Sequence, residues 1–410
     1  MTRWQSNTAL TFLAWTALAI DEYHPAMEGR GARPSTVPAL LTDDSSMPAV
    51  DIKCGTFQSV REQIPESALT TEALRRAYLW AHADGHTTWD GLEAELPKRI
   101  ASIRECLTNS MLRVADARRS QIDDTLNVLF ELEDDRRIES VLIPHWGNAT
   151  LCVSSQAGCA LACRFCETAS LGLLRNLEVW EIVDQLYRVR ALAGRRVTDV
   201  VFMGMGEPLH NYERVLTAAD IFHERRAAGV SARRITISTA GMVPQIHRFI
   251  DEKRPYRLAF SITSAIPEKR RELMPITERY PLNELADAIR RYAASLGARR
   301  WVTIQYVAIE NRNLGDEDVR ALGELLGDVP YIIDVVPFNP IASAPELSPP
   351  TADSMRELTR RLRSLERPIK VRHSGGKDMG SGCGQLAASW GGSRPEVDSG
   401  SMHGQGKTKL

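Results

Sequence analysis

The chain lacks a charge excess of either sign, because 51 Lys and Arg residues balance 52 Asp and Glu residues among 410. The net charge therefore does not indicate a nucleic-acid partner, although a neutral protein can still carry one basic face. Basic residues do gather in short runs such as Lys269-Arg270-Arg271. We interpret these runs as solvated helix faces, with a local RNA-binding face as the alternative.

The chain also lacks an apolar run of the ~20 residues that a transmembrane helix needs, so we expect no membrane association. The segment TALTFLAWTALAI (Thr8–Ile20) resembles the core of a signal peptide, with Ala17-Leu18-Ala19 as a cleavage site. Only Arg3 supplies positive charge before it. We therefore favour an appended amphipathic helix, or a misassigned start, over export.

Cysteine is scarce, and an odd count of seven argues against a disulfide framework and for a reducing compartment. Cys159, Cys163 and Cys166 lie together in CALACRFC, with the spacing C-x3-C-x2-C. Zinc prefers four ligands, usually as two spaced pairs. Three thiolates on a [4Fe–4S] cluster leave one iron open, where S-adenosylmethionine can chelate. We favour the cluster; a zinc site with a distant fourth ligand is the alternative.

Composition divides the chain into four parts. Residues 24–52 are rich in Pro, Gly, Ser and Asp, so 1–55 is predicted to be an N-terminal extension and flexible linker. Helical spacing, followed by the alternating segments TLNVLFELED and RIESVLIP, predicts an accessory helical domain and a β-hairpin over 56–144. A core is expected over 145–390, and the Gly/Ser-rich tail 391–410 is predicted to be disordered.

Strands and helices alternate after residue 150. The predicted strands are LCVSS, VTDVVFMG, RRITIST, YRLAFSIT, RWVTIQYVAI and YIIDVVPFN, and the predicted helices cover 178–193, 210–228, 243–252, 283–296, 316–327 and 352–366. Repeated βα units indicate an α/β fold with a parallel sheet and helices outside it. Six units are too few for a closed eight-stranded barrel, so we predict a partial (βα)6 TIM-like barrel.

Polar groups stand at the end of each predicted strand: Ser154-Ser155, GMGEP (Gly204–Pro208), Ser238-Thr239, Ser261 with Thr263, Gln305, and Asn339. One or two would be ordinary helix caps. Six in register predict a shared polar pocket at the barrel mouth, where βα barrels carry their chemistry. The cysteine triplet is expected to lie at the same end of the barrel. There Glu207 can accept hydrogen bonds from the ammonium of S-adenosylmethionine, and Phe165 can pack on its adenine.

Five segments together resemble the radical S-adenosylmethionine RNA adenine methyltransferases of the RlmN/Cfr family: LCVSSQAGCALACRFCETASLGLLRNL, FMGMGEPLHN, RRITISTAGMVP, VVPFNP and CGQLA. The resemblance covers about residues 58–390. It implies a barrel of the radical S-adenosylmethionine type and RNA contact by the accessory domain. It also implies that the cosubstrate contacts Phe165, Gly206, Glu207, Ser238, Ser261, Ile262, Thr263 and Asn339.

The same resemblance implies a covalent route with two molecules of S-adenosylmethionine per turnover. Cys383 in GCGQL would take a methyl from one molecule, and a radical made from the second would remove a hydrogen from this S-methyl. The methylene radical would add to adenine, Cys152 would resolve the adduct by forming a disulfide with Cys383, and Glu139 would accept a proton. From the residues alone, other interpretations stay open. Cys383 can be a stray thiol in a loop, Cys152 a buried core thiol, and Glu139 a solvent-facing glutamate.

The substrate implied is adenosine 2503 of 23S ribosomal RNA, methylated at C2, with adenosine 37 of transfer RNA open as a second target. The alternatives are C8 methylation of the same adenosine, a paralogue with a non-ribosomal substrate, and a non-catalytic RNA- or metal-binding protein. Three segments depart from the usual family pattern, with SITSA for SLHA, VPFNP for IPWNP, and GSG for DAA before Cys383. These departures affect the expected identity of the substrate more than the expected type of reaction. We expect a cytoplasmic monomer that receives electrons from a donor such as flavodoxin.

Overall fold

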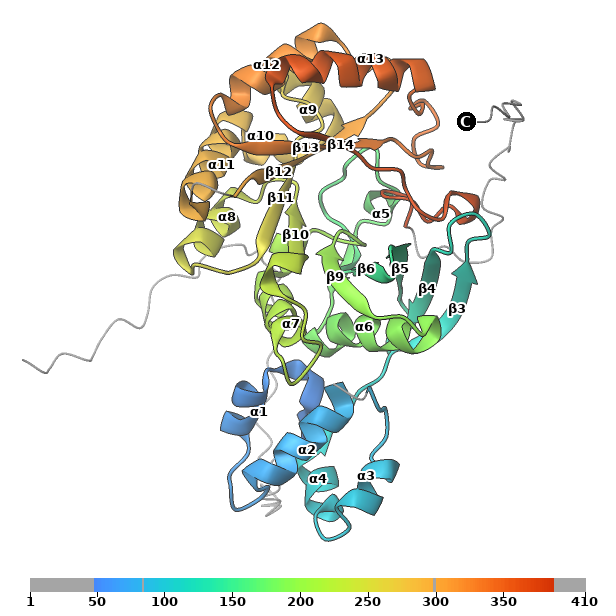
Figure 1. Cartoon of the computed structure of the whole chain (residues 1–410), viewed down its shortest axis with the longest axis vertical. Coiled ribbons are helices and arrows are strands. Elements are labelled where there is room, and N and C mark those ends of the chain that lie inside the picture. Colours follow the sequence, from blue (N-terminus) through green and yellow to red (C-terminus); the bar gives the residue numbers. More distant parts are fainter. Residues whose placement is uncertain (1–47, 83–84, 298–299, 387–410) are drawn as a thin grey trace, which may run out of the picture. The chain divides into compact units, whose positions relative to one another are not determined.

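The computed structural model describes residues 48–82, 85–297 and 300–386. A sheet of ten strands, in the order β14-β13-β12-β11-β10-β9-β6-β5-β4-β3, runs through this part of the chain (Figure 1). The signal-like segment at 8–20, most of the predicted linker and the tail 391–410 lie outside the described residues. None of the helices in the described part is long and apolar enough to cross a membrane.

Seven neighbouring strands of the sheet are parallel. They are β6 (Asn148–Cys152), β9 (Val197–Phe202), β10 (Ile235–Thr239), β11 (Arg257–Ser261), β12 (Val302–Ala308), β13 (Tyr331–Pro337) and β14 (Ile369–Val371). All six predicted strands are present, and β14 adds a short strand that the sequence pattern did not reveal. The parallel order confirms the α/β fold and the partial barrel, because the strands follow one another along the chain with helical crossovers between them.

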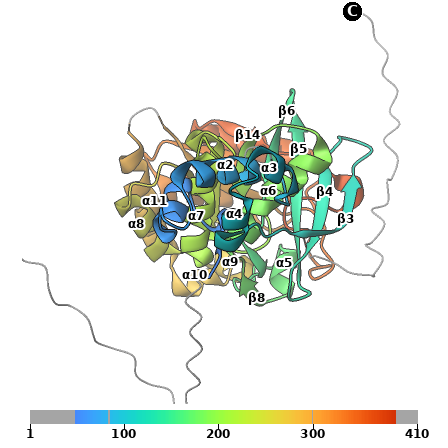
Figure 2. The same cartoon turned by 90° about the horizontal axis from the view of Figure 1, so that it is seen from below.

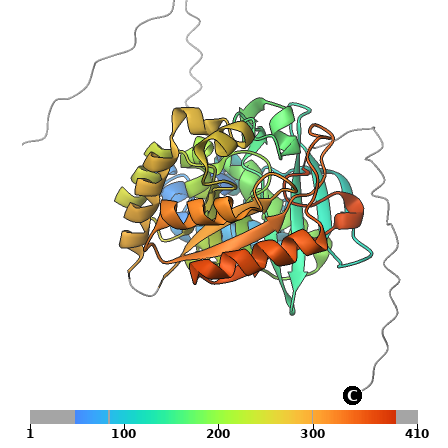
Figure 3. The same cartoon turned by 90° about the horizontal axis from the view of Figure 1, so that it is seen from above.

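Helices cover the outer side of this sheet. The six predicted ones are α6 (Val179–Ala193), α7 (Tyr212–His223), α8 (Val243–Asp251), α11 (Leu282–Leu296), α12 (Asp316–Leu326) and α13 (Ala352–Leu362). Two short helices, α9 (Pro267–Leu273) and α10 (Ile276–Arg279), stand between β11 and α11. Figure 3 shows the orange and red helices α12 and α13 side by side. This arrangement leaves the carboxyl ends of the strands free to form a site.

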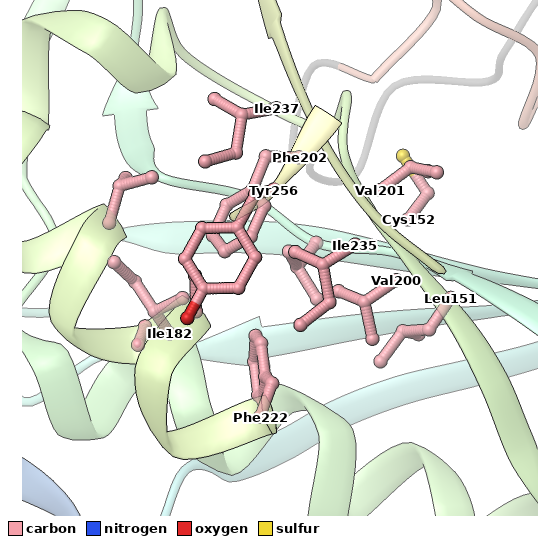
Figure 4. Packing of buried hydrophobic residues seen from close by; sticks show 14 of the residues in the cluster. Leu151, Cys152, Ile182, Val200, Val201, Phe202, Phe222, Ile235, Ile237 and Tyr256 are labelled. Carbon is pink, nitrogen blue, oxygen red and sulfur yellow. The ribbon is translucent and has the colours of Figure 1, made fainter. Parts of the chain in front are cut away.

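The core lies between the strands and these helices. Figure 4 shows Leu151, Val200, Phe202, Ile235 and Ile237 of β6, β9 and β10 facing Ile182 of α6 and Phe222 of α7. All seven are fully buried, and the rings of Phe202 and Phe222 are 6.0 Å apart. Burying such a side chain contributes about 1.5–3 kcal/mol, so this layer fixes the strand ends that carry the site.

The N-terminal described segment is helical, with α1 (Phe57–Gln63), α2 (Thr71–His82), α3 (Asp90–Glu95) and α4 (Ile100–Cys106) (Figure 2). Apolar residues recur at helical spacing over 89–107, but this segment forms two helices, α3 and α4. The interruption falls at Pro97, which has no N–H to donate to the preceding turn. Two short strands, β1 (Val50–Asp51) and β2 (Leu107–Thr108), pair in parallel and join the ends of this segment.

Buried polar contacts join the helical segment to α6. Lys53 in the 3-10 helix η1 (Ile52–Cys54) forms a fully buried salt bridge with Asp184 of α6, at 2.7 Å. Its ammonium also donates to the Ser110 carbonyl at 2.6 Å, and the Leu112 N–H donates to Asp184 at 2.8 Å. The pair is therefore fully hydrogen-bonded, which a buried ion pair needs in order to be tolerated.

Lys53→Met should destabilise the fold by about 3 kcal/mol, because it leaves the buried Asp184 carboxylate with only the longer contact to Arg188, at 3.4 Å. Urea denaturation followed by circular dichroism measures this loss. The matched control is Arg75→Met, which breaks an exposed pair with Glu72 and should scarcely move the midpoint. Equal midpoints for the two variants would contradict the role of the buried pair.

Three antiparallel strands extend the same sheet beyond β6. They are β3 (Arg113–Arg119), β4 (Leu126–Glu131) and β5 (Arg137–His145), and β5 pairs directly with β6. The predicted hairpin corresponds to β4 and β5, with Asp135 at φ 62° in its turn. The mostly exposed β3, at the sheet edge, was not predicted. The accessory hairpin is thus hydrogen-bonded to the strand that leads into the cysteine triplet.

Candidate active site

A cavity of about 950 Å³ opens at the carboxyl ends of strands β9 to β13. It is lined by Gly204, Gly206 and Glu207 after β9, Ser238 in β10, Ser261 in β11, Gln305 in β12 and Asn339 after β13. The strand-end polar groups were predicted to share a pocket, and five of the six strand ends do. Cys159, Cys163, Phe165, Cys166 and Cys383 line the same cavity.

The loop that carries the three cysteines is fixed at both ends and in the middle. It connects β7 (Gln156–Gly158) to β8 (Leu173–Asn176), which pair with one another, and contains the short helix α5 (Glu167–Ser170). Cys159 N–H donates to the Gly172 carbonyl at 2.8 Å, and Arg164 N–H donates to the Leu273 carbonyl at 3.0 Å. Gly158 has φ 74°, and a Cβ there would lie 1.9 Å from the Gly172 oxygen, so only glycine fits.

Burial dominates the electrostatics of the triplet. It raises the pKa of Cys159 to about 12 and that of Cys163 well above the usual range, with the neighbouring thiols adding to both shifts. Three desolvated thiols whose charges add to the raised pKa values need positive charge to ionise together, and bound iron would supply it.

The donor set fits a cluster with one open position. All three thiols are free and line one cavity. No three His, Cys, Asp or Glu side chains of the described residues converge as around a single metal ion. A [4Fe–4S] cluster does not require this convergence, because each thiolate binds a different iron.

The GMGEP turn is built around Gln156. The Gln156 amide oxygen accepts from the Glu207 N–H at 2.8 Å, and a Cβ at Gly206, where φ is 101°, would lie 2.6 Å from the Gln156 side chain. Burial raises the pKa of Glu207 to about 7, although its carboxylate accepts from the Ala240 and Leu209 N–H groups. A cationic group arriving in the cavity would therefore find a carboxylate that its own charge helps to ionise.

The remaining predicted cosubstrate residues fall into two groups. Ser238 donates to the Phe202 carbonyl at 2.7 Å, and Ser261 donates to the Gln305 side chain at 3.4 Å, so both hydroxyls are held at the cavity wall. Ile262 and Thr263 follow β11 but stand behind the wall, fully buried. Thr263 has φ 55°, and its hydroxyl has no hydrogen-bond partner within the described residues.

Cys383 lies in the loop after β14, and hydrogen bonds bring this loop to the cysteine triplet. Asn339 donates to the Cys383 carbonyl at 3.0 Å, and Glu167 N–H donates to the Gly384 carbonyl at 2.7 Å. A Cβ at Gly384, with φ 84°, would approach the Phe165 oxygen to 2.9 Å. The Cys383 thiol is reached from the open cavity, yet the surrounding protein raises its pKa to about 11.

Cys152 ends strand β6, next to the cavity rather than in its wall. Burial raises the pKa of Cys152 to about 12, and the second cause is the charge of Cys383. Arg372, which is paired with Asp334 at 2.6 Å, lowers the pKa of both thiols. Cys152 therefore lies within electrostatic range of Cys383. Figure 4 shows Cys152 at the edge of the core layer.

Glu139 is buried and does not face solvent. It lies on β5, is 1% exposed and accepts from Asn127 of β4 at 2.7 Å. The same Asn127 amide donates to the Ser381 hydroxyl at 2.8 Å. One amide therefore links the Glu139 carboxylate to the loop of Cys383.

A second set of contacts ties the turn between β3 and β4 to this loop. Asp378 accepts from the Ser120 hydroxyl at 2.7 Å and from the Gln121 N–H at 3.0 Å. Gly376 N–H donates to Asp123 at 2.9 Å. Sequence reasoning missed these residues, because short polar side chains in a turn usually bond locally and carry no signal of a partner more than 250 residues away.

Asp378→Ala should release the Cys383 loop. Each lost hydrogen bond contributes about 1 kcal/mol, so the open form should become roughly tenfold or more populated. Release of the loop should return the raised pKa of Cys383 toward its ordinary value. In the unmethylated fraction of the protein, Cys383 should then be alkylated by iodoacetamide about tenfold faster, as measured by peptide mass spectrometry under anaerobic conditions. Asp353→Ala on the exposed face of α13 is the control and should leave the rate unchanged. An unchanged rate in Asp378→Ala would show that the turn does not hold the loop.

Comparison with known proteins identifies the family of this chain. Residues 153–324 match the Radical SAM superfamily. A probable RNA methyltransferase of Myxococcus xanthus is 38% identical over 343 residues, which cover 83% of this chain and 94% of that protein. Dual-specificity RNA methyltransferase RlmN of Syntrophobacter fumaroxidans is 42% identical over 277 residues, 67% of this chain and 80% of that protein. The chain belongs to the RlmN/Cfr family of radical S-adenosylmethionine methyltransferases.

A solved structure of this kind has the same fold. The crystal structure of a radical SAM methyltransferase from Sphaerobacter thermophilus has a TM-score of 0.78 and 34% identity, over 83% of this chain and all of that one. The cofactors of the RlmN/Cfr family are a [4Fe–4S] cluster and S-adenosylmethionine. Three thiols and the strand-end polar groups line one cavity. The residues of this chain therefore fit both cofactors in that cavity.

Proposed function

We propose that the chain methylates an adenosine of 23S ribosomal RNA at C2, and an adenosine of transfer RNA as a second substrate. The observation that carries the proposal is the placement of Cys383 in the wall of the cavity that the triplet also lines. A methyl acceptor beside a radical source is what methylation of an unreactive ring carbon requires. Relatives bear the name dual-specificity RNA methyltransferase RlmN, which supports an RNA substrate.

In this proposal Cys159, Cys163 and Cys166 hold the cluster. A [4Fe–4S] cluster held there would, with S-adenosylmethionine bound, supply a 5′-deoxyadenosyl radical. Glu207 accepts hydrogen bonds from the cosubstrate ammonium, and burial makes this carboxylate responsive to that positive charge. Gly206 lets the backbone approach the cosubstrate, and Phe165 packs against its adenine.

Cys383 acts as the methyl carrier. Its sulfur attacks the methyl carbon of one S-adenosylmethionine, S-adenosylhomocysteine leaves, and the thiol proton passes to solvent. After loss of one hydrogen atom the S-methylene carbon bonds to adenine, and RNA and protein are then linked. The hydrogen bonds from Asn339 and Glu167 N–H hold the backbone beside Cys383 during these steps.

Cys152 and Glu139 complete the route in this proposal. Glu139, kept in place by Asn127, accepts the proton that the adenine ring carbon loses. Cys152 would then attack the sulfur of Cys383, and the bond from this sulfur to the methylene carbon would break. The methylene carbon would take the Cys152 proton to become the methyl group, a disulfide would form, and the unpaired electron left by radical addition would return to the oxidised cluster. The charge of Cys383 raises the pKa of Cys152, which supports placing the two thiols near one another.

The partners proposed follow from the same chemistry. Structured RNA is recognised largely by shape and by splayed bases, so local basic faces are sufficient in a chain of net charge −1. The target adenine must leave its stack to reach the cavity. An electron donor such as flavodoxin reduces the cluster, and we propose a monomer in the cytoplasm.

Nucleoside mass spectrometry tests the function. The chain is expressed in a bacterium that lacks its own RlmN-type gene, and purified 23S and transfer RNA are digested to nucleosides. We expect 2-methyladenosine in both RNAs and none with Cys383→Ala. Appearance of 8-methyladenosine would establish the C8 alternative, and neither nucleoside would indicate a paralogue with another substrate.

A further inference from the structure

Arg270 on α9 is the largest side chain in the described residues that is fully buried, with 1% exposure. Its guanidinium donates to the carbonyls of Ser261 at 2.8 Å and Ala240 at 2.7 Å, and also to that of Ile262. It touches the Met274 sulfur at 3.2 Å. None of these partners is a carboxylate, which is unusual because a buried arginine normally has one.

The guanidinium stays charged despite its burial. Desolvation lowers the pKa of Arg270, but only to about 10, so the cation persists at neutral pH. Carbonyl oxygens satisfy its N–H groups without neutralising it, and the Nε atom has no partner within the described residues. A net positive charge therefore stands in a region of low dielectric, where it acts strongly on other charges nearby.

The acceptors of Arg270 form the wall of the cavity. Ala240 and Ser261 both line it, one just after β10 and the other at the end of β11. Met274, which Arg270 touches, lines it too. Arg270 thus ties together the ends of two neighbouring strands from behind the cosubstrate pocket.

The same helix also holds the cysteine loop. The carbonyl of Leu273, the last residue of α9, accepts from Arg164 N–H, which lies between two predicted cluster ligands. The Cys163 side chain packs against the apolar cluster that contains Leu273 and Met274 beside Arg270, and the charge of Arg270 lowers the pKa of the Cys163 thiol. The unpaired cation and the thiol triplet are therefore joined through one short helix.

We propose that Arg270 is the counter-ion of the cluster, a positioning residue whose fixed charge offsets the thiolates and stabilises the cluster once it has accepted an electron. The proposal rests on the assignment of the cluster to Cys159, Cys163 and Cys166. Net charge and hydrogen bonding are the main controls of a cluster's reduction potential. Reduction adds one negative charge to a site that has already gathered three thiolates, so a nearby cation should favour it.

Three variants separate the charge of Arg270 from its geometry. Arg270→Gln removes the charge and keeps an amide donor. Arg270→Lys keeps the charge but loses the fork that reaches several carbonyls. Arg271→Gln is the matched control, since Arg271 is exposed on the same helix. Each protein is reconstituted anaerobically with iron and sulfide, and iron content and thermal unfolding of the apoprotein are recorded.

The reduction potential is then measured by titration with dithionite and redox mediators, with electron paramagnetic resonance reporting the reduced cluster. At the wild-type midpoint potential, Arg270→Gln should lower the ratio of reduced to oxidised cluster at least tenfold, which is 59 mV for one electron. Arg270→Lys and Arg271→Gln should stay within about threefold of the wild type.

Each remaining outcome is decisive. A wild-type potential in an iron-loaded Arg270→Gln protein overturns the proposal, and so does an Arg270→Lys protein that shifts as far as Arg270→Gln. If Arg270→Gln binds no iron while Arg270→Lys binds it at the wild-type potential, the charge requirement is supported; loss of iron from both overturns it. A wild-type chain without cluster iron would contradict the proposed function instead.

Discussion

Cys383→Ala should load its cluster and still produce 5′-deoxyadenosine, yet transfer no methyl to RNA. The thiol is the proposed methyl carrier, and the other cavity-lining thiols are the predicted cluster ligands. A methyl transferred through sulfur cannot reach adenine without that sulfur, so activity should fall below detection. The measurement is tritium transfer from methyl-labelled S-adenosylmethionine to RNA, together with the iron content.

The wild-type protein provides the complementary observation. Purified from cells, its Cys383 peptide should carry the mass of one added methyl group. Cys106→Ala, which removes a half-buried thiol of α4, is the control and should leave transfer unchanged. Full methylation of RNA by Cys383→Ala would mean that the methyl passes directly to adenine.

Cys152→Ala should trap the enzyme on its substrate. Cys383 would still be methylated and the adenine still attacked, but no thiol would remain to resolve the adduct. The variant should therefore leave cells covalently attached to an RNA fragment, visible as a nuclease-sensitive mass shift with nucleotide absorbance. Its turnover should be lost almost completely.

The double variant lacking both Cys152 and Cys383 should carry no RNA, because no methylene radical forms. If Cys152 were only a core thiol, its loss would cost stability on the order of 1 kcal/mol and leave turnover intact. Normal turnover by Cys152→Ala without RNA-linked protein would therefore remove Cys152 from the mechanism.

Periodicity predicted the strands and helices that are long enough to show it. The six predicted strands of the barrel all formed, because each is a run of five or more residues that buries apolar side chains in a parallel sheet. β14 has three residues, Ile369–Val371, and only its pairing with β13 makes it a strand. The break between α3 and α4 was available from Pro97, since proline ends a helix whatever the apolar spacing around it.

The site was predictable where chemistry demands a residue type at a fixed spacing, as in the cysteine triplet. It was not predictable where burial decides the role. In Lys269-Arg270-Arg271 the prediction of a solvated face was wrong for Arg270. Lys269 does pair with Asp318 and Glu317 near the surface, and Arg271 is exposed. The turn of helix α9 points Arg270 alone into the cavity wall, which three letters of sequence do not show.

Glu139 illustrates the same limit on a strand. The sequence left two interpretations of Glu139 in RIESVLIP, a functional carboxylate and a solvent-facing side chain. Five successive residues, Ile138–Leu142, are buried instead, because one face of β5 packs on the core and the other meets the loop of Cys383 through Asn127. The alternation of a hairpin strand cannot reveal a loop from the far end of the chain.

Isotope transfer tests the central claim, that the methyl reaches adenine through Cys383 as a methylene radical. The reconstituted enzyme turns over RNA with S-adenosylmethionine whose methyl group carries three deuteriums, and the modified nucleoside and 5′-deoxyadenosine are analysed by mass spectrometry. The radical removes one deuterium from the S-methyl group. The account predicts a product methyl that retains two deuteriums and 5′-deoxyadenosine that contains the third. A product with all three deuteriums, accompanied by unlabelled 5′-deoxyadenosine, would contradict it.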